Sequence, residues 1–166
     1  MPDWVIREIR EHDIGDIAAL ERDIFPDPWT ESGIRETLRQ ENTVLLGAWK
    51  NDIMSGYVIL YYVLNEGEIA RIAVGRSDRR QGCADYLFGR LRDICGRKGI
   101  TRMMLEVRES NAAAVSFYKK CGFTEDGVRK KYYSNPCEDA ILMSVETDGR
   151  FDSSSHWKVS CEKDIM

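Results

Sequence analysis

The order of strand-like and helix-like segments in this sequence predicts an α/β fold. Two apolar runs, residues 44–49 and 53–64, flank Lys50-Asn51-Asp52 and indicate a β-hairpin. Apolar residues between Ala84 and Cys95 instead recur at helical spacing, which indicates an amphipathic helix. A chain of 166 residues has the length of one domain and can bury a sizeable core.

The first forty residues predict one strand and two helices. Residues 5–10 have apolar ends around alternating polar positions, as a strand has. Asp13 is expected to cap a helix that the Pro26-Asp27-Pro28 break ends, and Thr30 to cap a second helix that runs to about Arg39. The apolar face of the first helix comprises Ile14, Ile17, Ala18, Ile24 and Phe25.

Strands and helices continue to alternate beyond the hairpin. Asn65-Glu66-Gly67 is expected to turn the chain into a strand over 68–74, and the helix that begins at Ala84 is expected to end near Gly99. The remaining predicted elements are a strand at 103–107, a helix at 112–120 and strands at 124–131 and 139–146.

The C-terminal residues differ from the rest of the chain. Residues 147–166 combine Ser153-Ser154-Ser155 with scattered charges and show no periodic apolar pattern. We therefore expect one domain over 1–146, followed by a flexible tail over 147–166.

Composition excludes several classes of protein. The formal net charge of −4 argues against a general nucleic-acid binder. The charged N-terminus is unlike a signal peptide, and the longest uncharged stretch, 53–65, is shorter than the ~20 residues that a membrane helix needs. The 5 cysteines lack CxxC spacing, which favours reduced thiols over disulfides or zinc. These features predict a cytoplasmic protein with no metal site.

The segment after the 68–74 strand has the chemistry of a phosphate site. The run Arg79-Arg80-Gln81-Gly82-Cys83-Ala84 leads directly into a predicted helix, whose first N–H groups are unpaired and carry partial positive charge. Gly82 has no Cβ, so an anion can approach its backbone closely. The loop lacks the spelling of a Walker A or a GxGxxG motif. It predicts a pyrophosphate cradle, although a glycine between charged residues is also common in a polar turn.

Several motifs in the correct order resemble the GNAT family of N-acetyltransferases. Arg79-x-x-Gly82-x-Ala84 has the R-x-x-G-x-A form of that family's acetyl-CoA loop. Residues 105–123 read L-E-V-R-x-S-N-x-x-A-x-x-x-Y-x-x-x-G-F, which closely resembles the RimI-like branch that acetylates protein N-termini. Further matches are Phe25-Pro26-Asp27-Pro28-Trp29, Tyr132-Tyr133 and Glu138-Asp139-Ala140, so the resemblance spans Trp4 to Glu146.

The resemblance implies a mixed, mostly antiparallel sheet with helices on both faces and a splayed central strand pair. The strands that end at Val74 and Val107 would separate, with the arm of acetyl-CoA between them. Backbone groups of Ile72, Ala73 and Val74 would bind that arm, and the Val74 N–H would polarise the thioester carbonyl. The alternative is that residues 72–74 are only a buried strand. The two are compatible, because the backbone can bind the cofactor while the side chains face the core.

The same resemblance implies where acetyl-CoA binds. Asn111 would touch the cofactor, or would only cap the helix that follows it. Arg79 and Arg80 would face the phosphates, or would only face solvent. The full set of expected cofactor contacts in the loop and helix is Arg79, Arg80, Gln81, Gly82, Cys83, Ala84, Asp85 and Asn111.

Glu106 is the candidate general base. It lies inside the apolar strand sequence Met104-Leu105-Glu106-Val107, where a charge is costly unless it has a function or a partner. The resemblance makes it the group that accepts the proton of the amine, directly or through water. The alternative is a structural carboxylate paired with Arg102 or Arg108.

Tyr118 is the candidate general acid. The intrinsic pKa of a phenol, near 10, suits proton donation to a departing thiolate. Its position near Phe117 and Phe123 is equally typical of a core aromatic residue. The surrounding motif favours the acid role.

Aromatic residues would form the acceptor site. The Pro-Asp-Pro turn would hold Phe25 and Trp29 beside the site, and Tyr132 and Tyr133 would form the opposite wall. The acidic residues Glu66, Glu68 and Glu138 would favour a cationic amine. Each also has an ordinary explanation in packing or surface polarity. The resemblance implies transfer of the acetyl group to a protein N-terminal α-amine, typically the N-terminal alanine of a ribosomal protein.

Two other functions remain open. The same chemistry would serve a small-molecule amine or a lysine side chain, and a non-catalytic acyl-CoA-binding module would keep the loop without turnover. Glu106 and Tyr118 together argue against the non-catalytic module. For the enzyme we expect no nucleic-acid or membrane partner and a monomer or weak oligomer.

Overall fold

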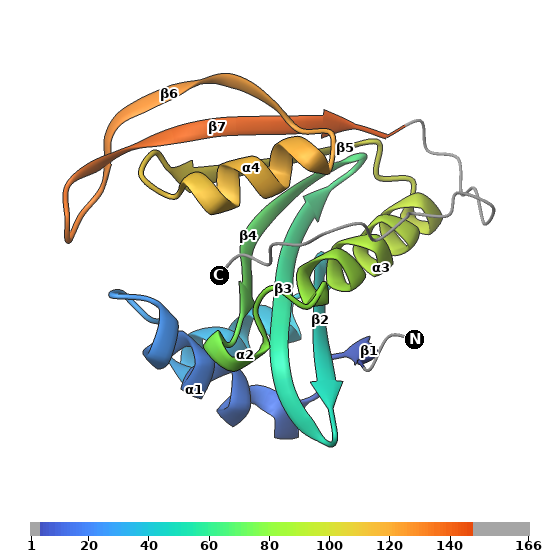
Figure 1. The fold of residues 1–166 in the computed structure, drawn as a ribbon. Helices are drawn as coiled ribbons and strands as arrows, with labels where there is room; N and C mark the ends of the chain where they lie inside the picture. The colour runs from blue at the N-terminus through green and yellow to red at the C-terminus, as the bar shows by residue number, and fades with distance from the viewer. Residues whose placement is uncertain (1–3, 148–166) are drawn as a thin grey trace.

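Seven strands form one mixed sheet in the order β1-β2-β3-β4-β5-β7-β6 (Figure 1). In this computed structural model, which describes residues 4–147, β4 and β5 pair in parallel and the other neighbours are antiparallel. The predicted mixed, mostly antiparallel α/β fold is confirmed. The strands are β1 Val5–Glu8, β2 Thr43–Lys50, β3 Ile53–Val63, β4 Glu66–Val74, β5 Arg102–Arg108, β6 Thr124–Tyr133 and β7 Glu138–Glu146. The helices are α1 Ile14–Ile24, α2 Glu31–Arg39, α3 Cys83–Lys98 and α4 Ala112–Lys120, with short 3₁₀ turns η1 Glu11–Asp13 and η2 Arg76–Asp78.

Side chains that alternate along the central strands explain why helices cover both faces. In β2, Val44, Leu46 and Ala48 pack in the hydrophobic cluster that includes α3 and α4. Leu45 and Trp49 point to the other face, where they pack with α1 and α2. The sheet is therefore covered on both faces, as expected.

The central strands β4 and β5 separate part-way along their length. They pair only from Glu66 opposite Arg102 to Ile69 opposite Leu105. Beyond Ile69, β4 continues against β3 as far as Val74, and β5 continues against β7 as far as Arg108. The splayed strand pair is confirmed.

A β-bulge lies where the two strands separate. Ile59 of β3 faces Arg71, whereas the next residue, Leu60, faces Ile69, so Ala70 has no counterpart on β3. An extra residue of this kind bends the strand and turns the following side chains. The bulge thus sets the direction in which Arg71 leaves β4.

Of the two helix caps predicted for α1 and α2, the structure contains the one at Thr30 but not the one at Asp13. The Thr30 side chain accepts a hydrogen bond from the Gly33 N–H at 3.1 Å, which confirms it as the cap of α2. Asp13 makes no such bond to α1. Its carboxylate instead accepts bonds from the Arg10 N–H at 2.8 Å and from Arg7 at 2.8 and 3.1 Å, because η1 turns the chain before α1 begins. The prediction that Asp13 caps α1 is wrong.

Strand ends also differ from expectation by a few residues. β1 ends at Glu8 where residues 5–10 were expected, and β4 begins at Glu66 because Glu66 already pairs with Val63. β6 continues to Tyr133, which pairs with Glu138, so the two adjacent tyrosines lie on the strand.

The predicted tail is described at Thr147 alone, whose N–H donates to the Thr101 carbonyl at 2.6 Å. Residues 148–166 and 1–3 lie outside the described part of the chain. Within residues 4–147, no helix combines the length and apolarity that crossing a membrane requires.

Candidate active site

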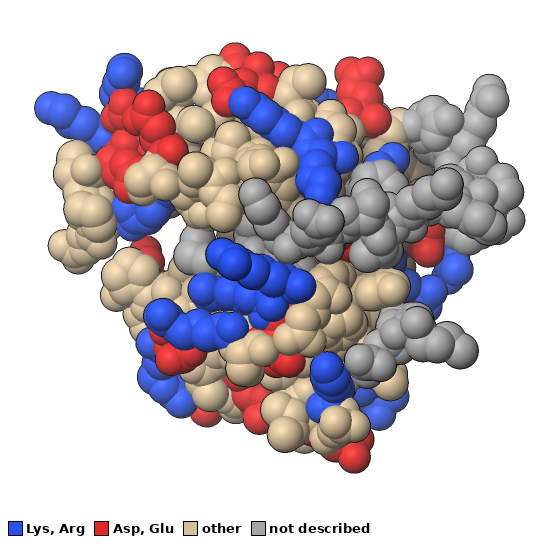
Figure 2. Space-filling view, viewed as in Figure 1, with Lys and Arg blue, Asp and Glu red and all other residues tan. Residues whose placement is uncertain are grey.

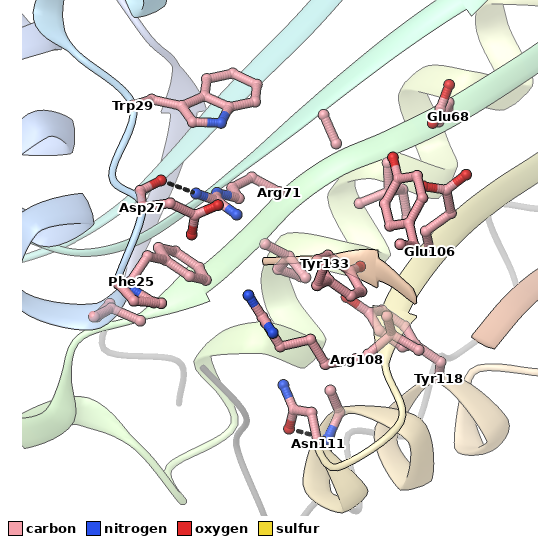
Figure 3. A pocket seen from close by; sticks show the side chains of 18 residues that line it. Phe25, Asp27, Trp29, Glu68, Arg71, Glu106, Arg108, Asn111, Tyr118 and Tyr133 are labelled. Atoms are coloured by element: carbon pink, nitrogen blue, oxygen red, sulfur yellow. Dashed lines mark hydrogen bonds between the residues drawn. The ribbon is translucent and has the colours of Figure 1, made fainter. Parts of the chain in front are cut away.

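A cavity of about 370 Å³ opens where β4 and β5 separate (Figure 3). One wall is the loop between α1 and α2, and the others are the two splayed strands, the start of α4 and the end of β6. The cavity brings together nine of the residues predicted for the site. They are Phe25, Trp29, Glu68, Ile72, Glu106, Asn111, Tyr118, Tyr132 and Tyr133.

Glu106 reaches this cavity from β5 with its side chain 18% exposed. Its Oε1 lies 3.4 Å from Nε of Arg129 on β6, and a hydrogen bond with Glu106 is the main cause that raises the pKa of Tyr132. The expected alternative partners are engaged elsewhere: Arg102 lies 3.6 Å from Glu66, and Arg108 3.5 Å from Glu138. A structural pairing of Glu106 with Arg102 or Arg108 is therefore wrong. The side chain of Arg129 is mostly exposed, so its ion pair with Glu106 contributes little free energy.

Tyr118 belongs to the core and to the cavity at once. Its ring packs edge-on against Phe117 and Phe123, with centroids 5.7 and 5.6 Å away, and the residue also lines the cavity. Burial raises the pKa of Tyr118, and Cys121 and Tyr133 add to that rise. The hydroxyl thus keeps its proton at neutral pH, which a general acid requires.

Asn111 caps α4 and lines the cavity. Its side-chain oxygen accepts a hydrogen bond from the Ala114 N–H at 3.1 Å, so the capping role is confirmed. The same residue borders the cavity, and a cofactor contact remains compatible with the cap.

The predicted phosphate loop connects β4 to α3. Gly82 has φ of 90° and Arg80 has φ of 63°, so the chain makes a left-handed turn immediately before Cys83 begins α3. Arg79 points back to β4, where its Nε donates to the Val74 carbonyl at 3.1 Å, and burial lowers its pKa. Arg79 therefore holds the loop against the strand. We had expected its side chain to face either the phosphates or solvent.

Side chains just after the turn face the protein interior. Cys83, Ala84 and Asp85 are buried, so their backbone groups are what a cofactor at the start of α3 can meet. The Gln81 side chain donates to the Ser77 carbonyl at 3.2 Å within the loop. Figure 2 shows Lys and Arg side chains gathered near the middle of this face, over the loop that leads into α3. This positive charge suits an anionic cofactor.

Ile72, Ala73 and Val74 lie beyond the point at which β4 leaves β5. Their side chains are buried, with Ile72 and Val74 on one face of the sheet and Ala73 on the other. The strand remains paired with β3 on one side only, so backbone groups on its other side face the gap. Ala73, Val74 and residues 79–85 do not line the cavity itself.

Residues 14–123 match the Acetyltransferase (GNAT) family. This chain belongs to the GNAT family of acetyltransferases. Such enzymes take their acetyl group from acetyl-CoA. The chain is 34% identical over 120 residues to the ribosomal protein bS18-alanine N-acetyltransferase of Escherichia coli strain K12. This match covers 71% of this chain and 80% of that protein.

Solved structures agree with this assignment. The crystal structure of the ribosomal-protein-S18-alanine N-acetyltransferase from Escherichia coli matches with a TM-score of 0.81 and 30% identity, over 86% of this chain and 93% of that chain. The crystal structure of Ard1 from Thermoplasma volcanium matches with a TM-score of 0.82 and 25% identity, over 88% and 99% of the two chains.

The sequence prediction missed an ion pair at the wall of the cavity of this GNAT acetyltransferase, between a buried carboxylate and a partly buried arginine. Glu21 of α1 is fully buried, and Arg71 of β4 binds it through Nε and Nη2, each at 3.1 Å. A signal was present, because Glu21 falls on the apolar face of its helix and Arg71 interrupts the apolar run of its strand. A charged residue within an apolar pattern needs a partner of opposite charge when it is buried.

Arg108 was also missed as a structural residue of the GNAT site. Its guanidinium donates to the carbonyl oxygens of Ser134 at 3.0 Å and Pro136 at 3.1 Å, and lies 4.4 Å from the centroid of the Tyr133 ring. It therefore holds the turn between β6 and β7 beside the cavity. Among residues 4–147, no group of three His, Cys, Asp or Glu side chains is placed to hold a metal ion.

The left-handed turn at Gly82 predicts how the GNAT loop responds to substitution. Gly82→Val puts a side chain on the surface that the phosphates approach, so we expect acetyl-CoA to bind about tenfold more weakly or worse. Titration calorimetry measures this affinity directly.

Gly99→Val is the matched control. Gly99 ends α3 with φ of 72° and open space around it, so valine there carries a similar backbone strain of roughly 1–2 kcal/mol. Acetyl-CoA affinity should be kept in this variant. Equal affinity in both folded variants would remove the loop from the cofactor site.

Proposed function

We propose that this enzyme transfers the acetyl group of acetyl-CoA to the N-terminal α-amine of a protein, typically the N-terminal alanine of a ribosomal protein. The observation that carries the proposal is the cavity between the splayed strands, which joins Glu106 and Tyr118 to two aromatic walls. The name of the Escherichia coli relative, a ribosomal protein bS18-alanine N-acetyltransferase, supports the same acceptor. Acetylation of a ribosomal protein places the reaction in the cytoplasm, and we expect the enzyme to act as a monomer or weak oligomer.

The reaction begins with a neutral amine and a polarised thioester. The arm of acetyl-CoA lies along the free side of Ile72 to Val74, the loop from Arg79 to Ala84 receives its pyrophosphate, and the Val74 N–H donates to the thioester oxygen. The Glu106 carboxylate accepts a proton from the amine, directly or through water, as the amine nitrogen bonds to the acetyl carbon.

Collapse of the tetrahedral intermediate completes the transfer. The carbon–sulfur bond breaks, and the Tyr118 hydroxyl gives its proton to the departing thiolate to form CoA. The proton held by Glu106 then leaves to solvent, and Tyr118 takes one back, so both groups are restored.

The acceptor occupies the space between the two aromatic walls. Phe25 and Trp29 lie on one side of the cavity (Figure 3), and Tyr132 and Tyr133 lie on the other, with ring centroids 4.9 Å apart and ring planes at 88°. Glu68 adds negative charge that attracts a protonated amine. An N-terminal α-amine has an intrinsic pKa about 2.5 units below that of lysine, so a larger fraction of it is neutral and able to attack at pH 7.

An acceptor panel tests the proposed function. The purified protein is mixed with acetyl-CoA and, separately, with peptides that have free N-terminal alanine, peptides with lysine and a blocked N-terminus, and polyamines. We expect release of CoA with the N-terminal peptides at a kcat/KM well above that of the other acceptors. Preferential turnover of the lysine peptides or polyamines would replace the proposed acceptor, and no CoA release from any acceptor would indicate a non-catalytic module.

The base assignment predicts a large loss on Glu106→Gln. Glutamine keeps the shape and hydrogen bonding of the side chain but cannot accept the proton, so kcat should fall by ~10²–10⁴ with acetyl-CoA affinity nearly unchanged. Glu66→Gln is the control, because Glu66 also pairs with an arginine of the sheet, Arg102 at 3.6 Å, and does not line the cavity. Turnover by Glu106→Gln equal to that of the control would assign Glu106 a structural role.

The acid assignment predicts that Tyr118→Phe loses turnover with little loss of stability. Phenylalanine keeps the contacts with Phe117 and Phe123 and deletes only the hydroxyl, so the melting temperature should change little. The loss should shrink with an acyl donor whose thiol has a lower pKa, because that leaving group needs less protonation. An equal loss across donors would contradict proton donation and indicate that the hydroxyl positions the cofactor.

A further inference from the structure

Four hydrogen-bond donors from three residues converge on one carboxylate behind the cavity. Glu21 is 0% exposed, and its Oε1 accepts hydrogen bonds from the Tyr57 hydroxyl and from Nε of Arg71. Its Oε2 accepts bonds from Nη2 of Arg71 at 3.1 Å and from the Trp29 N–H at 3.0 Å. A buried charge is stable only when it is paired and hydrogen-bonded in this way.

Arg71 joins this carboxylate to the aromatic wall. Its Nη2 also donates to the Asp27 carbonyl at 3.1 Å, a bond drawn in Figure 3. The guanidinium carbon lies 3.8 Å from the centroid of the Phe25 ring and 5.7 Å from that of Trp29. One planar cation thus contacts two aromatic rings, a carboxylate and a backbone carbonyl, which lysine cannot reproduce.

The ion pair fastens the α1–α2 loop to the strand that contains the bulge. Two backbone groups of the loop, the Asp27 carbonyl and the Trp29 N–H, find their partners in Arg71 and Glu21 respectively. Arg71 follows Ala70, where β4 separates from β5, so its position is coupled to the opening of the cavity. A shift of Arg71 would move the wall that the acceptor meets.

We infer that Glu21 and Arg71 are positioning residues for the acceptor: their ion pair holds Phe25 and Trp29 against β4, and this places the amine in line with Glu106. The inference rests on the proposed function in one respect, that the acceptor occupies the cavity beneath this loop. Neither residue exchanges a proton with the substrate. Their effect is on how often the bound acceptor is correctly placed.

Arg71→Lys is the central variant. Lysine keeps the charge opposite Glu21, so the buried carboxylate remains paired, but it loses the two-pronged bond and the bond to the loop. We expect the KM for the acceptor to rise ~10-fold or more, while the acetyl-CoA dissociation constant stays within about twofold. The measurements are steady-state kinetics on the best acceptor of the panel and calorimetry with acetyl-CoA.

The pair is tested by Glu21→Gln, Arg71→Met and the double variant. If the two residues act as one unit, the acceptor KM of the double variant should be no higher than that of the worse single variant. The double variant also removes both buried charges, so it tests the inference if Glu21→Gln alone does not fold. Arg35→Met is the control, because it removes an arginine–glutamate pair of α2, with Glu11 at 2.9 Å, that lies outside the cavity.

Three results would overturn the inference. The first is an unchanged acceptor KM in folded Arg71→Lys. The second is a loss of acetyl-CoA affinity in Arg71→Lys as large as the rise in its acceptor KM. The third is a double variant whose rise in acceptor KM equals the product of the rises in the two single variants. Failure of the proposed function appears separately, in the wild-type protein. If a lysine peptide or polyamine is the acceptor that is turned over, the same variants are measured on that acceptor.

Discussion

The early separation of β4 and β5 is the constraint on which the rest of this molecule depends. The two strands pair over Glu66–Ile69 and residues 102–105 and then diverge, yet each keeps its outer neighbour, so the sheet is opened without being broken. Backbone N–H and C=O groups that face the gap have no strand partner and need hydrogen bonds from another source. A cofactor with amide groups along its arm supplies such bonds, which explains why an acyl carrier is suited to this gap.

Each of the two separated strands carries an arginine that fastens one wall of the cavity. Arg71 on β4 holds the loop between α1 and α2, and Arg108 on β5 holds the turn between β6 and β7. Both guanidinium groups are paired with carboxylates, Glu21 and Glu138, so their charges are already compensated. The planar, five-donor guanidinium suits this task because it can bind a carboxylate and backbone carbonyls at the same time.

The charge on Glu106 is compensated less firmly than that of Glu21. Its partner Arg129 is more than half exposed, and an exposed ion pair contributes little free energy. An incoming ammonium group can therefore compete for Glu106, whereas it cannot compete for the fully buried Glu21. This difference agrees with the roles that we propose, a general base for Glu106 and a positioning residue for Glu21.

Local patterns were enough to predict the order of the elements, the family and half of the residues that line the cavity. Thr30 and Asn111 cap helices through bonds that span three residues, and Gly82 marks a left-handed turn, so each is set by its own neighbourhood. The proposed catalytic and wall residues were predicted because motifs place them at fixed points of a known fold. Their convergence on one cavity then follows from the splayed sheet.

Partners of charged groups were decided by the tertiary structure. Asp13 binds Arg7 across a turn that the pattern did not reveal, and Glu106 meets Arg129 because β7 lies between β5 and β6 in the sheet. Glu21 and Arg71 are 50 residues apart and meet only after α1 packs on the face toward which the bulge directs Arg71. Such contacts depend on strand order, register and bulge position, which arise from the packing of the whole chain and not from any short segment of it.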